Sequence, residues 1–456
     1  MKKLFGTDGV RGLANSELTA GLAFDLGRAG AFVLTKENKA PNILIGCDTR
    51  ISGDMLEAAL TAGMCSVGAN VLAAGVIPTP AVAYLVRKYD LDAGVMISAS
   101  HNPFWDNGIK FFNSEGYKLK DELEAEIEGL ICNGLGDLPA PVAKDVGRRS
   151  TANHALADYI GFLQSVACGE KGWQTLSGLK IALDCANGAA YQAAPKLFEA
   201  LGAHIGVINN TPSGVNINEN CGSTYMESLI QFVREGGYDI GFAFDGDADR
   251  CFAVDESGEI ADGDMIMAIL GCHLRDKGLL KQNTIVATVM SNLGFFLMAE
   301  ENGLNIEKTT VGDRYVLEKM LQCGYNFGGE QSGHIIFLDH STTGDGLLTA
   351  IQLASIVKHS SLPMSRLNTK MKKMPQVLEN AKINNRHKNK LIEHQTVKKE
   401  IAALEQHFAG RGRVLIRPSG TEPVVRVMIE GENFNEISKE ARRIRDLFEG
   451  LAASFE

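Results

Sequence analysis

Short apolar segments alternate with helical patterns through most of this 456-residue chain, and the alternation starts again twice along the sequence. Apolar runs of strand length, separated by helical stretches, are typical of βα units packed around largely parallel sheets. Several of the expected strands, such as 93–97 and 238–244, end in polar runs, and the run after 238–244 contains a glycine. The pattern predicts an α/β fold of three similar mixed α/β domains, with functional loops at strand ends.

The last part of the chain has a different pattern. Two expected strands at 413–416 and 424–430 and two expected helices at 390–407 and 436–451 indicate a smaller α+β domain. A Gly/Pro-containing stretch also separates the first two groups of alternating strands and helices. We therefore expect domains at 1–150, 151–258, 259–361 and 362–456.

Composition argues against several classes of protein. The formal net charge of -10 disfavours a nucleic-acid-binding surface, because such surfaces concentrate Lys and Arg. No run approaches the roughly 18 apolar residues of a membrane helix, and no apolar signal region follows Lys2 and Lys3. The 9 cysteines include no Cys-x-x-Cys pair and fit reduced thiols. We expect a cytoplasmic protein without nucleic-acid or membrane partners.

Ser100 stands in a polar run, 98–103, directly after an expected buried strand. Most Ser/Asn/Pro runs are simple turns, but a serine delivered by a strand end can also carry a phosphate. A serine hydroxyl is a weak nucleophile, so that role requires basic neighbours and charge neutralisation. His101, Lys110 and the run 245–250 can supply both.

Asp245, Asp247 and Asp249 place three carboxylates at every second position. On a tight loop they can converge on one hard cation, and oxygen ligands suit Mg²⁺. The same spacing begins an EF-hand calcium loop, but Arg250 occupies the position of the required glycine, and both flanks are strand-like. A solvated acidic turn is the other alternative. Placement at a strand end favours the metal site.

A glycine-rich run at 328–334 also follows an expected strand. Glu330 and Ser332 in this run can bind sugar hydroxyls, although a glycine-rich turn with an exposed glutamate is an equal alternative. The basic stretch 382–399 lacks interleaved aromatic residues and indicates a solvated face.

Two further runs carry donors for a phosphate group. The run 417–423, with Arg426 beyond it, combines two guanidinium groups, two hydroxyls and a glycine amide, which together suit a phosphate dianion. The alternative is a surface turn between antiparallel strands. Arg11, in the run 6–12, can lie beside a phosphate or in an N-terminal turn.

Five of these motifs together resemble the α-D-phosphohexomutase family, and most closely its bacterial phosphoglucosamine mutase branch. They span essentially the whole chain, in the family's order. The motifs are Gly-Thr-Asp-Gly-Val-Arg-Gly, the Ser100 loop with Asn107-Gly108-Ile109-Lys110, the aspartate loop, Gly-Glu-x-Ser-Gly-His and Arg-Pro-Ser-Gly-Thr-Glu-Pro. The resemblance implies three related α/β domains and a flexible fourth domain around a central cleft.

The resemblance also implies roles for individual residues. Ser100 is the phosphoserine and, with the three aspartates, a ligand of Mg²⁺. Its catalytic partners are His101, Lys110 and Arg11. The implied substrate-binding residues are Glu330, Ser332, His334, Asp313, Arg314, Arg417, Ser419, Gly420, Thr421 and Arg426. For Arg250 a phosphate contact and a structural role are both open.

The implied enzyme interconverts glucosamine 6-phosphate and glucosamine 1-phosphate, in the route to UDP-N-acetylglucosamine, with glucosamine 1,6-bisphosphate as intermediate and activator. The run 310–316 resembles the specificity loop of this branch, and Asp313 suits an ammonium on C2. The partner is thus a small-molecule aminosugar phosphate, and a homodimer is left open.

Three alternatives remain. The one within the family is a phosphomannomutase/phosphoglucomutase. A silent sugar-phosphate-binding protein would not need Ser100, and a metal-dependent phosphatase would release inorganic phosphate.

Overall fold

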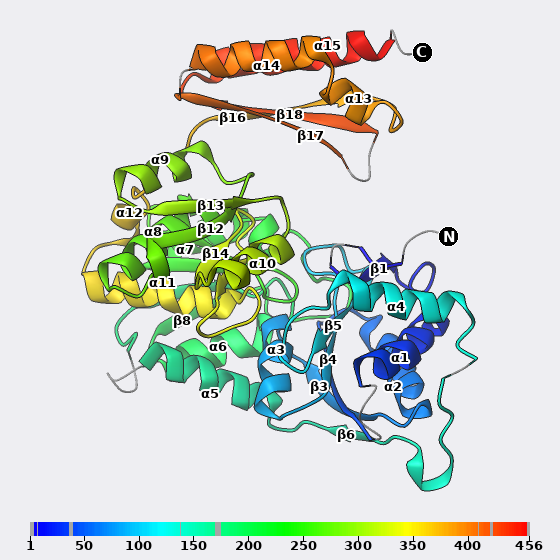
Figure 1. The fold of residues 1–456 in the computed structure, drawn as a ribbon. Coiled ribbons are helices and arrows are strands. Elements are labelled where there is room, and N and C mark those ends of the chain that lie inside the picture. Colours follow the sequence, from blue (N-terminus) through cyan, green and yellow to red (C-terminus); the bar gives the residue numbers. More distant parts are fainter. Residues whose placement is uncertain are drawn as a thin grey trace. The chain divides into compact units, whose positions relative to one another are not determined.

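The computed structural model describes residues 4–6, 8–35, 40–136, 138–168, 175–408, 410–419 and 423–453. The chain divides into two compact units, one of residues 1–290 and 303–370, and one of residues 291–302 and 371–456. Figure 1 labels their elements. Among the helices described, none is long and apolar enough to cross a membrane.

The first layer of the larger unit is a six-stranded mixed sheet in the order β1-β5-β4-β2-β3-β6. β4, β2, β3 and β6 are parallel, whereas β5 pairs antiparallel with both β4 and β1. This return strand places Lys110 opposite Met96, next to the end of β4. The elements are β1 (Val10–Leu13), α1 (Ala20–Leu34), β2 (Asn42–Cys47), α2 (Gly53–Ser66), β3 (Asn70–Val76), α3 (Thr79–Lys88), β4 (Ala93–Ile97), β5 (Asp106–Asn113), α4 (Asp121–Cys132) and β6 (Arg149–Thr151).

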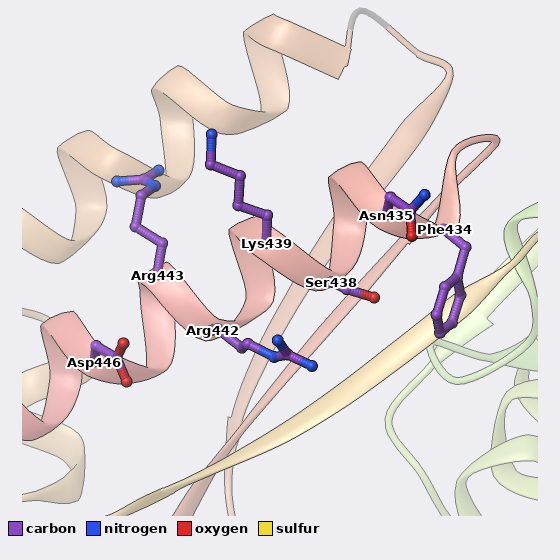
Figure 2. A pocket seen from close by; sticks show the side chains of 7 residues that line it. All are labelled: Phe434, Asn435, Ser438, Lys439, Arg442, Arg443 and Asp446. Carbon is purple, nitrogen blue, oxygen red and sulfur yellow. The ribbon is translucent and has the colours of Figure 1, made fainter.

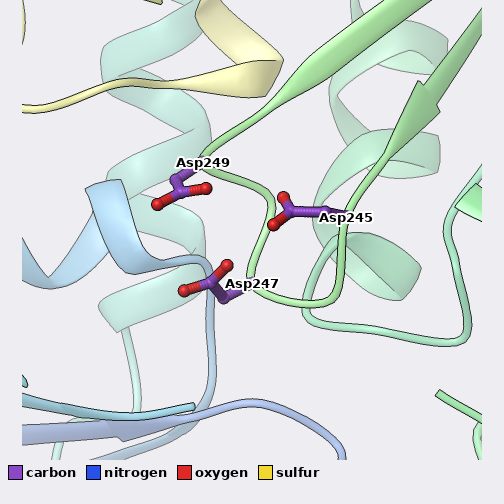
Figure 3. A group of neighbouring side chains, drawn as sticks. All are labelled: Asp245, Asp247 and Asp249. Carbon is purple, nitrogen blue, oxygen red and sulfur yellow. The ribbon is translucent and has the colours of Figure 1, made fainter. Parts of the chain in front are cut away.

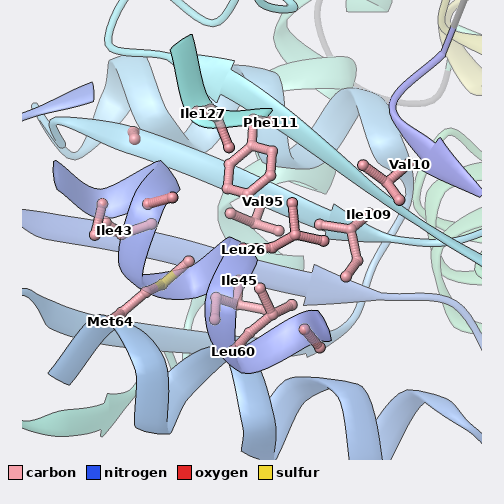
Figure 4. Packing of buried hydrophobic residues seen from close by; sticks show 14 of the residues in the cluster. Val10, Leu26, Ile43, Ile45, Leu60, Met64, Val95, Ile109, Phe111 and Ile127 are labelled. Carbon is pink, nitrogen blue, oxygen red and sulfur yellow. The ribbon is translucent and has the colours of Figure 1, made fainter. Parts of the chain in front are cut away.

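The core of this layer lies between the sheet and the helices α1, α2 and α4, as Figure 4 shows. Leu26 of α1 and Leu60 of α2 are fully buried there. The two helices cross closely because a Cβ at Gly27 would lie 2.5 Å from the Leu60 carbonyl oxygen, and one at Gly63 would lie 2.2 Å from that of Phe24. Only glycine permits this approach, so helix packing holds the sheet that carries the Ser100 loop.

The second layer is a five-stranded sheet in the order β11-β10-β9-β7-β8. β9 is buried along its whole length and pairs antiparallel with β10, Phe244 opposite Cys251. The aspartate run is therefore the turn that joins two paired strands. The elements are α5 (Ala155–Cys168), β7 (Lys180–Asp184), α6 (Ala190–Ala200), β8 (His204–Ile208), α7 (Glu227–Gly236), β9 (Ile240–Phe244), β10 (Cys251–Asp255) and β11 (Ile260–Ala261).

The third layer is a four-stranded sheet in the order β13-β12-β14-β15. β14 and β15 pair antiparallel, Gly329 opposite Ile335, so residues 330–334 form the turn between them. The elements are α8 (Gly263–Asp276), β12 (Thr284–Thr288), β13 (Asn305–Thr309), α10 (Asp313–Cys323), β14 (Phe327–Gly329), β15 (Ile335–Phe337), α11 (Gly346–Ser360) and α12 (Met364–Leu367).

The smaller unit contains a three-stranded antiparallel sheet in the order β16-β18-β17, covered by helices. The helix expected over 390–407 is wrong in one respect, because two helices stand there in place of one. The elements are α9 (Leu293–Glu301), β16 (Gln376–Lys382), α13 (Lys388–Ile392), α14 (Gln395–Phe408), β17 (Gly412–Pro418), β18 (Val424–Gly431) and α15 (Phe434–Ala453). The three sheets of the larger unit with their helices, and the α+β sheet of the smaller unit, confirm the expected fold class.

On α15 lies a hollow of about 510 Å³, drawn in Figure 2. None of the predicted site residues lines it. Its lining is Phe434, Asn435, Ser438, Lys439, Arg442, Arg443 and Asp446.

Candidate active site

Ser100 lies just beyond the end of β4 with a φ of 52°, in the left-handed region that few residues other than glycine adopt. Its side chain is buried, and its Oγ donates a hydrogen bond to Asp245 Oδ2 at 2.6 Å. The same Oγ lies 3.3 Å from His101 Nδ1. The fold thus brings the predicted nucleophile to the predicted metal loop, although the two are far apart in the sequence.

The three aspartates of the metal loop are buried and face one another, as Figure 3 shows. Their ligand oxygens lie within 4.8 Å of one another. Oδ1 of Asp247 and Oδ1 of Asp249 are buried without a hydrogen-bond partner among the described residues. A buried carboxylate oxygen without a partner is costly, and a cation would compensate it. The cluster therefore fits a hard divalent metal ion.

The surroundings of the cluster shift the pKa values of Asp245 and Asp247 in opposite directions. Burial, Asp249 and Asp247 together raise the pKa of Asp245 well above its usual range. Burial acts in the same sense on Asp247, but Lys110 and Thr79 outweigh it and hold the pKa of Asp247 below its usual range. Lys110 Nζ lies 2.8 Å from Asp247 Oδ2, and Thr79 Oγ1 donates to the same oxygen at 2.6 Å.

Asp8 connects three cations beside this cluster. Its Oδ2 lies 3.0 Å from Lys110 Nζ, and its Oδ1 lies 2.6 Å from Lys118 Nζ. It also forms an ion pair with Arg11. Burial raises the pKa of Asp8, but Lys110, Lys118 and Arg11 outweigh that effect and hold it well below its usual range. Asp8 and Lys118 are not among the predicted site residues. Asp8 belongs to the amino-terminal motif, so the sequence could have indicated it. No local sequence pattern distinguishes Lys118 from other lysines.

His101 contacts Ser100, and the charges of Arg11 and Arg250 act on His101. Burial, Arg250 and Arg11 lower the pKa of His101 to about 4, so its imidazole is neutral near pH 7. Nε of Arg11 and Nε of Arg250 are buried without a hydrogen-bond partner in the described part of the chain. Guanidinium N–H groups of this kind donate well to phosphate oxygens.

The turn 330–334 contacts the start of β10, directly after the metal loop. Gly333 accepts a hydrogen bond from the Cys251 amide at 3.1 Å, and a Cβ at Gly333, where φ is 88°, would lie 2.6 Å from the Cys251 carbonyl oxygen. Glu330 Oε1 accepts from the Gly312 amide at 3.1 Å, and burial raises the pKa of Glu330. Ser332 lies half-buried in the same turn.

His334 and Asp313 lie together next to the metal loop. His334 Nε2 is 3.8 Å from Asp249 Oδ2 and 3.6 Å from Asp313 Oδ2, and His334 Nδ1 is buried without a partner among the described residues. Asp313 Oδ2 also lies 2.6 Å from Lys118 Nζ. Burial raises the pKa of Asp313, but Lys118 and His334 outweigh it and lower it below its usual range.

The Arg314 side chain, by contrast, contacts carboxylates outside the aspartate cluster. It pairs with Asp121, and its Nε donates to Glu318 Oε1 at 3.1 Å. Both contacts hold the guanidinium at the start of α10.

The predicted phosphate clamp belongs to the smaller unit. Arg417 and Arg426 stand opposite each other on β17 and β18. Burial and the charge of Arg426 lower the pKa of Arg417, and like charges directly opposite are unfavourable, so an anion would stabilise the pair. Gly420 and Thr421 lie outside the described residues.

Ser419 and Lys388 lie next to this pair. Lys388 Nζ donates to the Ser419 carbonyl at 2.7 Å and is only 5% exposed, so the expected solvated face at 382–399 is wrong at this residue. A single lysine in a basic run gives no sign of such burial.

Residues 2–134, 157–258 and 262–374 match the families described as phosphoglucomutase/phosphomannomutase alpha/beta/alpha domains I, II and III, and residues 371–447 match the C-terminal domain of the same proteins. Phosphoglucosamine mutase of Ruminiclostridium cellulolyticum is 60% identical over 99% of this chain and 99% of its own. Phosphoglucosamine mutase of Clostridium novyi is 58% identical over 99% of this chain and 100% of its own.

Solved structures share the fold. A phosphoglucomutase/phosphomannomutase family protein from Burkholderia thailandensis has a TM-score of 0.82 at 22% identity, covering 98% of both chains. N-acetylphosphoglucosamine mutase of Aspergillus fumigatus, solved with GlcNAc-6P and magnesium, has a TM-score of 0.67 at 18% identity, covering 98% of this chain and 96% of its own. The family resemblance is confirmed, and the main interpretation is favoured over the phosphomannomutase/phosphoglucomutase alternative. The chain belongs to the α-D-phosphohexomutase family and, within it, to the phosphoglucosamine mutases.

Proposed function

We propose that this enzyme interconverts glucosamine 6-phosphate and glucosamine 1-phosphate through a phosphoserine at Ser100 and a glucosamine 1,6-bisphosphate intermediate. The observation that carries the proposal is the 2.6 Å hydrogen bond from Ser100 Oγ to Asp245, in a buried cluster where two carboxylate oxygens lack a hydrogen-bond partner among the described residues. The relatives named phosphoglucosamine mutase, at 56–60% identity, support the substrate.

Mg²⁺ would be held by Ser100 and the three aspartates of the cluster. When bound, the ion would act as a Lewis acid that neutralises charge on phosphate oxygens. Lys110 would contribute a second positive charge, because Asp247 and Asp8 outweigh the effect of burial and raise its pKa. Arg11 and Arg250 would donate to phosphate oxygens their Nε–H groups, which have no hydrogen-bond partner among the described residues; Arg250 Nε lies 3.9 Å from Asp249 Oδ1.

In the forward step the free sugar hydroxyl loses its proton and its oxygen bonds to phosphorus, while the P–Oγ bond of phosphoserine breaks and Ser100 Oγ takes up a proton. In the return step the P–O bond between the sugar and its other phosphate breaks and that sugar oxygen takes up a proton, while Ser100 Oγ bonds to the phosphorus and loses its own proton. Neutral His101, with Nδ1 at 3.3 Å from Oγ, is placed to accept that proton. Lys110 remains charged throughout and is suited to electrostatic stabilisation.

Sugar recognition would come from Glu330, Ser332 and His334 in one turn. Arg417 and Arg426 would bind a phosphate group, with Ser419 beside them. Gly420 and Thr421 complete this proposed phosphate-binding motif in the sequence.

The remaining expectations belong to the same proposal. A net charge of -10 supports the expected absence of a nucleic-acid partner. A cytoplasmic compartment, the absence of a membrane partner and a homodimer stay predictions.

The substrate preference gives the test of this proposal. We expect kcat/KM for glucosamine 1-phosphate to exceed that for glucose 1-phosphate and mannose 1-phosphate by about 10- to 150-fold, because a hydrogen bond to a charged group contributes about 1.5–3 kcal/mol. Asp313→Asn should remove most of this preference, since the substrate ammonium would share the carboxylate with Lys118. The three substrates are compared in steady-state assays, each primed by its matching bisphosphate.

Asp121→Asn is the matched control, because it removes a neighbouring carboxylate that pairs with Arg314 and not with Lys118. Equal efficiency with a neutral hexose phosphate in the wild type would favour the phosphomannomutase/phosphoglucomutase alternative. An unchanged preference in Asp313→Asn would discard only the role of that carboxylate.

A further inference from the structure

Arg50, just after β2, makes contacts that none of the roles above uses. It is 3% exposed, and its five N–H groups all have a partner. Nε donates to Asp48 Oδ2 at 2.9 Å. Nη1 and Nη2 donate only to backbone carbonyl oxygens between β4 and the start of β5. These are the oxygens of Ser100 at 2.8 Å, Asn102 at 2.8 Å, Pro103, and Asp106 at 3.0 Å.

Asp48 reaches the same loop by a second route. Its Oδ2 accepts a hydrogen bond from Ser98 Oγ at 2.6 Å, and Ser98 Oγ in turn accepts one from the Ser100 amide at 2.9 Å. Asp48 Oδ1 accepts from the Arg50 amide at 3.0 Å. The buried Asp48–Arg50 pair therefore holds the carbonyl oxygen of Ser100 directly and its N–H through one hydroxyl.

Holding both ends of this peptide segment matters because Ser100 has a strained backbone. A φ of 52° persists in a serine only when the surroundings determine it. Rotation to an ordinary φ would turn the side chain and remove the Oγ contact to Asp245. The Asn218 side chain also donates to the Ser100 carbonyl, at 2.9 Å, but does not reach its N–H in the described contacts.

We propose that Arg50, oriented by Asp48, is a positioning residue for phosphoryl transfer, which fixes the left-handed backbone of Ser100 and so directs its Oγ toward the aspartate cluster. The proposal rests on the proposed mutase function. Arg50 touches neither the carboxylates of the cluster nor Ser100 Oγ in the described contacts, so its effect passes through the backbone alone.

Two substitutions test the two routes separately. Arg50→Lys keeps the charge but cannot supply five donors in a fork, and Ser98→Ala removes the hydroxyl between Asp48 and the Ser100 amide. We expect each to lower kcat by about 10²-fold, the effect of small misplacement of a reacting group, with KM for the sugar phosphate within about twofold of wild type because no sugar-binding residue changes. Ser98→Thr, which keeps the hydroxyl, should restore most of kcat.

Arg149→Lys is the matched control, because Arg149 lies in the same layer and pairs with Glu57 at 2.9 Å, away from the loop. A second readout is independent of turnover: amide hydrogen exchange should quicken in residues 98–106 in Arg50→Lys and Ser98→Ala, with the rest of the first layer unchanged. If Arg50→Lys fails to fold, Ser98→Ala and its threonine rescue still decide the question.

Wild-type kcat in folded Ser98→Ala, or unchanged exchange in residues 98–106, would overturn the positioning role. A loss of kcat that threonine does not rescue would overturn it as well. A wild-type protein without mutase activity would instead remove the proposed function, and the exchange measurement would still show whether Asp48 and Arg50 hold the Ser100 loop.

Discussion

Replacing Ser100 by alanine is expected to lower mutase turnover by at least about 10⁴-fold, the scale of loss when a nucleophile is removed. Ser100 Oγ is the only side-chain oxygen of its loop that donates to the aspartate cluster in the described contacts, so the variant has no substitute atom to carry phosphate. Turnover is measured with glucosamine 6-phosphate, and intact mass before and after phosphatase treatment shows whether a phosphoryl-sized mass is lost only from the wild type.

Ser114→Ala serves as the control, because Ser114 is an exposed serine that follows β5 in the same layer. It should retain both the removable mass and full turnover. A folded Ser100→Ala protein with wild-type turnover would contradict the phosphoserine assignment. Release of inorganic phosphate as the main product of the wild type would instead indicate a phosphatase.

The sequence was sufficient where local pattern determines structure. The strand 93–97 is found with the predicted bounds, because it is a short apolar run bounded by polar residues. The break between α13 and α14 was not predicted, because both helices share one polar, basic composition and no proline or glycine separates them. In such a stretch, packing of Leu391 and Val397 into the core sets the helix bounds.

The candidate site divides in the same way. Asp245, Asp247 and Asp249 were found from the spacing within one turn, and Ser100 from its strand end. Arg50 was missed because its partners lie about fifty residues further along the chain, and nothing in its own run specifies them.

Lys118 was missed for a related reason. It stands between Asp8 and Asp313, and only the folded chain brings those carboxylates together. Ion pairs between distant segments depend on how the sheets and helices pack, and no local sequence pattern specifies that packing.

Replacing Asp245 by asparagine is expected to lower turnover by about 10²-fold or more, because the variant loses a metal-ligand oxygen and the acceptor of the Ser100 hydrogen bond. The effect on unfolding should depend on Mg²⁺. The sequence left a solvated acidic turn as the alternative, but the three carboxylates of the cluster are buried. Without metal, burial and two like charges disfavour the ionised Asp245, as its raised pKa indicates, so asparagine should raise Tm near neutral pH.

With Mg²⁺ the order should reverse, because a ligand that binds only the folded state stabilises it in proportion to affinity. Wild-type Tm should therefore rise on addition of Mg²⁺ and fall with a chelator, whereas Asp245→Asn should respond weakly. Asp276→Asn is the control, since Asp276 is an exposed acid on α8 whose described partner is the adjacent Arg275, and it should respond like the wild type. Full turnover of the wild type in excess chelator, or equal Mg²⁺ shifts in wild type and Asp245→Asn, would show that this cluster does not hold the metal.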